Sequence, residues 1–395
     1  MKIYADHAAT TAVSDTAMAA MLPCFQGIYA NPSSLHSPGQ RAAEKLAEAR
    51  EIFARNLNAA PREITFTSGG SESDVQALRT GAALGARKGK RHILSTKFEH
   101  HAVLHTLKAL EKEGFTVTLL DIPADGVVTA EAVREALRPD TCLVSVMFAN
   151  NEIGTIQPIE EIGAIAKEHG ILFHTDAVQA FGQLPINVDV CHIDMLSASG
   201  HKLNGPKGIG FLYIRKGVKI RSFVHGGAQE RKRRAGTENV PGIVGLGKAV
   251  ERAMSSMEER TAKERETRDY LIERVLTEIP YCRLNGDRTN RLPNNANFCF
   301  RFIEGESMLI KLDQKGICAS SGSACTSGSL DPSHVLLAIG LPHEIAHGSL
   351  RMTLGADTTK EDIDYTVDQL KEIVAHLRSM SPLYEDFIKK QQKNA

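Results

Sequence analysis

Two residues with complementary chemistry follow directly on two predicted strands. Asp176 closes the stretch "ILFHTD", and Lys202 follows "DMLSAS" in the tripeptide "GHK". In an open parallel sheet, ligands bind just past the carboxyl ends of the strands. An acid and a lysine at that edge form either a structural salt bridge or part of a pyridoxal phosphate site. That cofactor needs a lysine for its Schiff base and an acid for its ring nitrogen.

A glycine-rich turn favours the cofactor over the salt bridge. The strand "EITF" is followed by "TSGGSES", in which Gly69, Gly70 and Ser71 open a predicted helix. Glycines allow a close backbone approach, and a helix N-terminus offers free N–H groups to an anion. Alone, this stretch is typical of an ordinary strand–helix turn, since it matches neither of the common glycine-rich phosphate motifs. Together with Asp176 and Lys202, it predicts a phosphate cup.

Cys325 lies in the stretch "SSGSACTSGS", whose other residues are small. The composition predicts a mobile loop, which is an unusual place for a free thiol. The interpretation is either an incidental exposed thiol or a thiol that carries a group between two places. The seven cysteines are scattered and include no C-x-x-C pair, which argues against a disulfide framework and a cysteine-rich metal site.

Alternating strand and helix patterns run from about residue 40 to 255. Helical spacing in "RAAEKLAEAREIFARNL" and "IEEIGAIAKEHG" alternates with apolar runs such as "HILST", "CLVSVMFAN" and "GIGFLYI". This alternation predicts an α/β fold with a mostly parallel sheet covered on both faces. Beyond about 255 the pattern changes to α+β. We therefore predict a large domain over 15–255 and a small domain from 1–14 and 256–395 that carries the Cys325 loop.

The composition excludes some functions. Lys and Arg number 47, as do Asp and Glu, so the zero net charge gives no general attraction to nucleic acid or to a membrane surface. No run approaches the roughly 20 apolar residues of a membrane span. The polar start "MKIYADHAATT" is unlike a signal peptide. A cytoplasmic protein is therefore the expectation.

Motifs spread over almost the whole chain reveal a family resemblance. The stretches "DHAATT", "NPSSLHS", "FTSGGSES", "NNEIGT", "HTDAVQ", "SGHKLNGPKGIG", "RRAGTEN" and "SSGSACTSGS" together resemble the cysteine desulfurases of the NifS/IscS type. These are class V, fold-type I pyridoxal phosphate enzymes. The resemblance runs from residue 3 to about 385, and it implies a large domain with a mostly parallel seven-stranded sheet plus a smaller α+β domain.

The resemblance implies roles for the matching residues. Lys202 would hold pyridoxal 5'-phosphate, Asp176 would pair with its ring nitrogen, Gln179 would bind its phenolic oxygen, and His100 would stack on the ring as an acid/base. The implied phosphate ligands are Gly70, Ser71, Ser199, His201 and, from the other subunit of a homodimer, Thr237. The implied ligands of the substrate carboxylate are Asn151 and Arg351. No metal is expected.

One departure from the family pattern is visible. Ser71 stands where threonine is common, and it keeps the hydroxyl that would bind phosphate. The family's usual asparagines are also missing after Asp74. Either His334 or His347 could assist the thiol of Cys325, and the sequence does not choose between them.

The implied reaction is the removal of sulfur from L-cysteine, giving L-alanine and a persulfide on Cys325. The sulfur would then pass to an acceptor protein, with iron–sulfur cluster assembly as the expected use. Alternatives are a selenocysteine lyase, a sulfur donor for tRNA thiolation, an aminotransferase without need of the thiol, and a docking scaffold with secondary catalysis. Intact Lys202, Asp176 and Cys325 argue against the scaffold.

Overall fold

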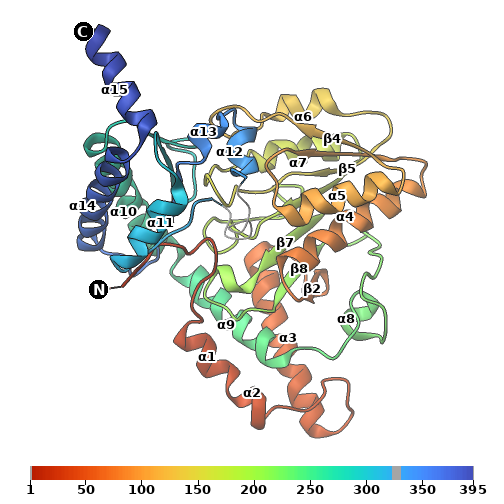
Figure 1. Ribbon diagram of the computed structural model, residues 1–395. Coiled ribbons are helices and arrows are strands. Elements are labelled where there is room, and N and C mark those ends of the chain that lie inside the picture. Colours follow the sequence, from red (N-terminus) through yellow and green to blue (C-terminus); the bar gives the residue numbers. More distant parts are fainter. Residues whose placement is uncertain (1, 323–330, 395) are drawn as a thin grey trace.

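A seven-stranded sheet forms the centre of the larger part of the molecule (Figure 1). The computed structural model describes residues 2–322 and 331–394. The strand order is β2-β8-β7-β6-β5-β3-β4, and β8 alone runs against its two neighbours, which confirms the predicted mostly parallel sheet. Its strands are β2 (Ile64–Thr67), β3 (His92–Thr96), β4 (Thr116–Leu120), β5 (Thr141–Ser145), β6 (Leu172–Asp176), β7 (Met195–Ser199) and β8 (Gly210–Ile214).

Helices cover both faces of this large sheet, because its strands carry apolar side chains on both faces. Ile93, Leu143 and Met195 pack with α4 and α5 on one face. Leu94 and Val144 belong to the opposite core, which α3, α7 and α9 also fill. The helices of this part are α1 (Asp15–Met21), α2 (Pro23–Gln26), α3 (Ser37–Leu57), α4 (Gly70–Ala86), α5 (His101–Lys112), α6 (Ala130–Ala136), α7 (Ile159–Glu168), α8 (Gln229–Lys232) and α9 (Val240–Ser255).

A second core surrounds a small antiparallel sheet of order β12-β10-β9. The first residues of the chain join it, because β1 (Ile3–Tyr4) pairs with β11 (Ile317–Cys318) and Ile3 is buried among its apolar side chains. Its strands are β9 (Cys282–Leu284), β10 (Asn295–Phe300) and β12 (Ser349–Thr353). The helices that follow α9 are α10 (Met257–Glu278), α11 (Gly305–Gln314), α12 (His334–Ala338), α13 (His343–Ala346), α14 (Lys360–Ser379) and α15 (Pro382–Asn394).

Two features of the fold differ from the sequence pattern. The apolar run "CLVSVMFAN" extends beyond the end of β5 at Ser145. The N–H groups of Val146 and Phe148 still donate to carbonyls of β6, whereas the N–H of Met147 donates to the buried carboxylate of Glu99. Helix α12 lies far along the chain, yet its Val335 and Leu336 are buried in the core of the large sheet. Helix α12 thereby brings a late segment of the chain near the carboxyl end of β3, where the Nε2 of His334 lies 3.0 Å from the carbonyl of Glu99.

The turn at α8 has a left-handed backbone. Glu230, Arg231 and Lys232 have φ of 45°, 57° and 64°, a conformation that ordinary side chains rarely adopt. A buried ion pair opposes this strain: the guanidinium of Arg50 donates to both carboxylate oxygens of Glu230, at 2.8 and 2.7 Å. The N–H of Phe66 donates to the same carboxylate at 3.1 Å. These hydrogen bonds therefore hold the turn against α3 and against β2 of the large sheet.

None of the helices in the described ranges combines the length and the apolar character needed to cross a bilayer.

Candidate active site

A cavity of about 200 Å³ lies at the carboxyl end of the large sheet. It is bounded by the ends of β6 and β7, the start of α4, the N-terminal segment and β12. Most of the predicted site residues line this cavity, and they come from segments far apart in the sequence. Its lining includes Gly70, Ser71, His100, Asn151, Asp176, Gln179, Ser199, His201, Lys202 and Arg351.

Lys202 reaches into this cavity from the short 3-10 turn Gly200–Lys202 that follows β7. Its Nζ donates to the backbone carbonyls of Ala8 and Ala9, at 2.5 and 2.8 Å. The amide of Gln179 donates to the same Ala8 carbonyl at 3.1 Å. The N-terminal stretch "DHAATT" is thus one wall of the cavity, a role that the sequence alone did not reveal.

The start of α4 fits a phosphate group. A side-chain carbon on Gly70 would lie 2.7 Å from a methyl group of Val178, and one on Gly210 would lie 2.7 Å from the Gly69 backbone. Glycine is therefore required for this close packing. Helix α4 has 17 residues, and the unpaired N–H groups of its first turn lie here beside the hydroxyls of Ser71 and Ser199.

His201 lines the same end of the cavity. Its Nδ1 lies 3.1 Å from the hydroxyl of Thr10, which fixes the ring. Burial and the charges of Lys202 and Lys207 lower its pKa to about 4, so the ring is neutral near pH 7. A neutral imidazole with one N–H donates to an anion by a hydrogen bond and brings no charge of its own.

Asp176 ends β6 and is 5% exposed. The backbone N–H of Val178 donates to its Oδ1 at 2.9 Å. Burial raises the pKa of this carboxyl to about 6, against the lowering effects of that hydrogen bond and of Lys202. A buried carboxylate in this position favours a cationic partner, and a protonated ring nitrogen supplies one.

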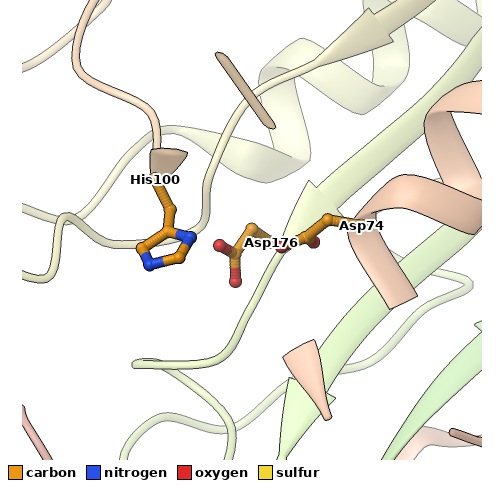
Figure 2. Close-up of side chains that lie close together, drawn as sticks. All are labelled: Asp74, His100 and Asp176. Carbon is orange, nitrogen blue, oxygen red and sulfur yellow. The ribbon is translucent and has the colours of Figure 1, made fainter. Parts of the chain in front are cut away.

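His100 faces Asp176 across the cavity (Figure 2). It caps α5: its Nδ1 accepts the N–H of Ala102 at 3.1 Å, so the neutral ring carries its proton on Nε2. Burial, with smaller effects from Lys202 and neighbouring histidines, lowers its pKa to about 4. A flat, neutral ring in a buried wall fits the predicted stacking role.

Arg351 comes from the middle of β12 in the small sheet and is 2% exposed. One Nη donates to Oδ1 of Asp6 at 3.0 Å, and the other donates to the backbone carbonyl of Asn151 at 3.0 Å. Among the described atoms, its buried Nε has no hydrogen-bond partner. These two contacts fix the guanidinium in place, and its Nε–H can donate to a carboxylate ligand.

One of the predicted residues lies elsewhere. Thr237 is exposed and does not border the cavity. Cys325 lies outside the described residues. Of the two candidate helpers, His347 is exposed, whereas the Nε2 of His334 lies 3.0 Å from the carbonyl of Glu99 and its ring centre lies 4.5 Å from that of His101.

Asp74 is the site residue that sequence reasoning missed. It lies one helical turn after Gly70, on the same side of α4, so the spacing of four residues was the available signal. One oxygen each of Asp74 and Asp176 and one nitrogen of His100 lie within 4.8 Å of one another. Such spacing suits a metal ion too, but a metal site needs neither the adjacent lysine nor the phosphate cup. The residues present fit pyridoxal phosphate.

Comparisons with known proteins agree with this chemistry. The family model for class-V aminotransferases matches residues 3–366. A protein named cysteine desulfurase IscS from Clostridium botulinum strain Hall is 53% identical over 394 residues, covering 99% of each chain. Its namesake from Methanosarcina thermophila is 55% identical over 96% of this chain and 94% of its own. A solved NifS-like protein superposes with a TM-score of 0.89 at 38% identity, over 95% of this chain and 100% of the other.

Proposed function

This chain belongs to the class-V aminotransferase family and is a cysteine desulfurase, and from this premise we propose that it uses pyridoxal phosphate to move sulfur from L-cysteine, through Cys325, to an acceptor protein for iron–sulfur cluster assembly. The observation that carries the proposal is the single cavity in which Lys202, Asp176 and Arg351 meet.

Lys202 would hold the cofactor, with its phosphate against Gly70, Ser71, Ser199 and His201. When bound, pyridoxal phosphate supplies an electron sink next to the substrate's α-carbon. Asp176 would keep the negative charge that a protonated ring nitrogen needs, and Gln179, which lines the same cavity, would bind the ring's phenolic oxygen.

The residues around the substrate have separate tasks. Arg351 binds the carboxylate of L-cysteine with the donors that Asp6 and the Asn151 backbone leave free. Asn151 lines the same part of the cavity. The ε-amine of Lys202 would move the α-proton, because it is the amine that lines the cavity, and the neutral ring of His100 would hold or return a proton through Nε2.

The sulfur transfer needs a second thiol besides that of the substrate. The thiolate of Cys325 attacks the substrate sulfur, so that an S–S bond forms as the C–S bond breaks. The electron pair of the C–S bond stays with carbon, which takes up a proton and leaves as L-alanine. The persulfide on Cys325 then passes its outer sulfur to the acceptor.

We further propose a cytoplasmic homodimer. Thr237 is exposed on a segment that Arg234 joins to Glu72, next to the phosphate cup, and a second copy of the chain would bring its own Thr237 to that cup. The described cysteines are all free thiols, which suits a reducing compartment.

The test uses wild type, Cys325→Ser and Lys202→Ala, each purified with pyridoxal phosphate. Wild type should be yellow and should release alanine and sulfide from L-cysteine with a reducing agent. Cys325→Ser should keep the cofactor and change its spectrum on adding cysteine, but lose at least about 100-fold of both products, since the nucleophile is missing.

Lys202→Ala should lose covalent attachment of the cofactor and all measurable turnover. Lys108→Ala is the matched control and should keep both, because Lys108 is an exposed lysine of α5 that does not border the cavity. Full activity of Cys325→Ser would refute the thiol's role. A wild-type protein that never binds pyridoxal phosphate would refute the function itself.

A further inference from the structure

Asp74 is a buried acid that the proposed reaction leaves without a task. It is 1% exposed, lines the cavity from α4, and has an oxygen within 4.8 Å of both Asp176 and His100 (Figure 2). Its Oδ1 has no hydrogen-bond partner among the described residues. Two buried carboxyls this close cannot both be charged without a compensating cation.

The groups that face Asp74 do not supply that cation. His174 of β6 lies 3.6 Å away, but its two ring nitrogens lie 2.9 and 3.0 Å from the hydroxyls of Ser145 and Ser197. Full burial lowers the pKa of His174 to about 3, so it is neutral. His100, at the start of α5, is neutral for the same reason.

The remaining neighbours are acids and one lysine. Glu99, beyond β3, is also fully buried, and burial raises its pKa to about 8. Lys202 is the cation at this end of the cavity, and the carbonyls of Ala8 and Ala9 hold it. One cation therefore faces three buried carboxyls. Burial first, and then the charge of Asp176, raises the pKa of Asp74 well above its usual range, and the nearby hydroxyl of Ser197 on β7 opposes this shift only in part.

We propose that Asp74 is a positioning residue that stands behind Asp176 as a neutral carboxylic acid, so that Asp176 alone presents negative charge to the cofactor's ring nitrogen. As an acid it keeps one O–H donor. Asp176 thereby keeps its charge, as its proposed pairing requires. This inference rests on the proposed cofactor.

The test exploits the fact that asparagine has the shape of a neutral aspartic acid. Wild type, Asp74→Asn, Asp74→Ala and Asp176→Asn are loaded with pyridoxal phosphate. The absorbance of the bound cofactor is recorded from about pH 6 to 9, and cofactor release is measured by dialysis. Asp74→Asn should match wild type within about threefold in cofactor affinity, with the same pH dependence, because it keeps a neutral donor.

Asp74→Ala removes the donor and leaves a gap behind Asp176, so its cofactor affinity should fall at least about tenfold and its absorbance midpoint should shift. Asp176→Asn should lose more, since it removes the charge itself. Thr80→Val is the matched control: Thr80 is equally buried on α4 with an unpartnered hydroxyl among the described atoms, but does not border the cavity. It should leave the spectrum unchanged.

The inference is overturned if Asp74→Asn behaves like Asp176→Asn, because Asp74 then acts through a charge, or if Asp74→Ala behaves like wild type. Should Asp74→Ala fail to fold, the asparagine variant still decides. Wild type without bound cofactor would refute the proposed function instead, so the two failures are distinguishable.

Discussion

The large and small sheets supply the cavity in different ways. The large sheet provides Asp176 and Lys202 from the points where its strands end, and Gly70 from the helix start that follows another strand. The small sheet provides Arg351 from the middle of β12, held by Asp6 from the other end of the chain. The large sheet thus places reactive groups by its topology, whereas the small sheet places a recognition group by tertiary contacts.

The largest expected effect concerns the stability of the part of the molecule that holds the large sheet. Glu230→Gln breaks the buried pair with Arg50 and leaves a buried guanidinium beside a strained turn, which should cost about 3–5 kcal/mol of unfolding free energy. Glu278 belongs to a more exposed group of ion pairs around Arg274, in the part of the molecule that holds the small sheet. Glu278→Gln should therefore lower the unfolding free energy by less than about 1 kcal/mol. Urea unfolding of both variants measures the contrast, and equal costs would remove it.

A smaller effect concerns recognition by the small sheet. Arg351→Lys replaces a planar fork by a single ammonium, so the KM for L-cysteine should rise about tenfold to hundredfold while kcat changes much less. Steady-state alanine release measures both constants. Arg378→Lys is the control, because that buried arginine packs on Tyr281 and Tyr384, away from the cavity. A fall in kcat with unchanged KM would give Arg351 a part in the chemistry.

The smallest effect is a pH dependence of stability. The pKa of His174 is about 3 in the folded chain and near 6.5 when unfolded, so the unfolded chain binds the proton first. Its contribution to stability is therefore present above about pH 6.5 and lost as pH falls, by about 1–2 kcal/mol at pH 5.

His174→Gln should flatten this loss in unfolding curves taken at several pH values. The control, His376→Gln, changes an exposed histidine of α14 and should leave the slope as it is. A wild-type protein whose stability does not change between about pH 7 and 5 would contradict the prediction.

The contrast between the large and small sheets also explains how much of the site could be predicted from the sequence. The strand-end rule found Asp176 and Lys202, and the turn chemistry found Gly70, because each of these signals is local. The family resemblance was needed for Arg351 and Asn151, since nothing within their own segments sets them apart. The mostly parallel sheet followed from the alternation of strands and helices.

Other residues were beyond local patterns. The carbonyls of Ala8 and Ala9 carry no side-chain signal, and they accept from Lys202 only through a contact between residues more than 190 positions apart. The left-handed turn at Glu230 runs against the preference of Glu230, Arg231 and Lys232, and the distant Arg50 and Phe66 hold it through the carboxylate of Glu230. Asp74 comes directly after the quoted stretch "FTSGGSES", but its burial depends on packing.

The pairing of the first residues with late ones has a consequence for how the protein is made. Ile3 pairs with Ile317, and Asp6 holds Arg351, so the N-terminal wall of the cavity is fastened by residues that leave the ribosome near the end of translation. The large sheet is complete in sequence by Ile214, long before that. The order of synthesis thus leaves a nascent sheet whose cofactor cavity stays open until almost the whole polypeptide has emerged.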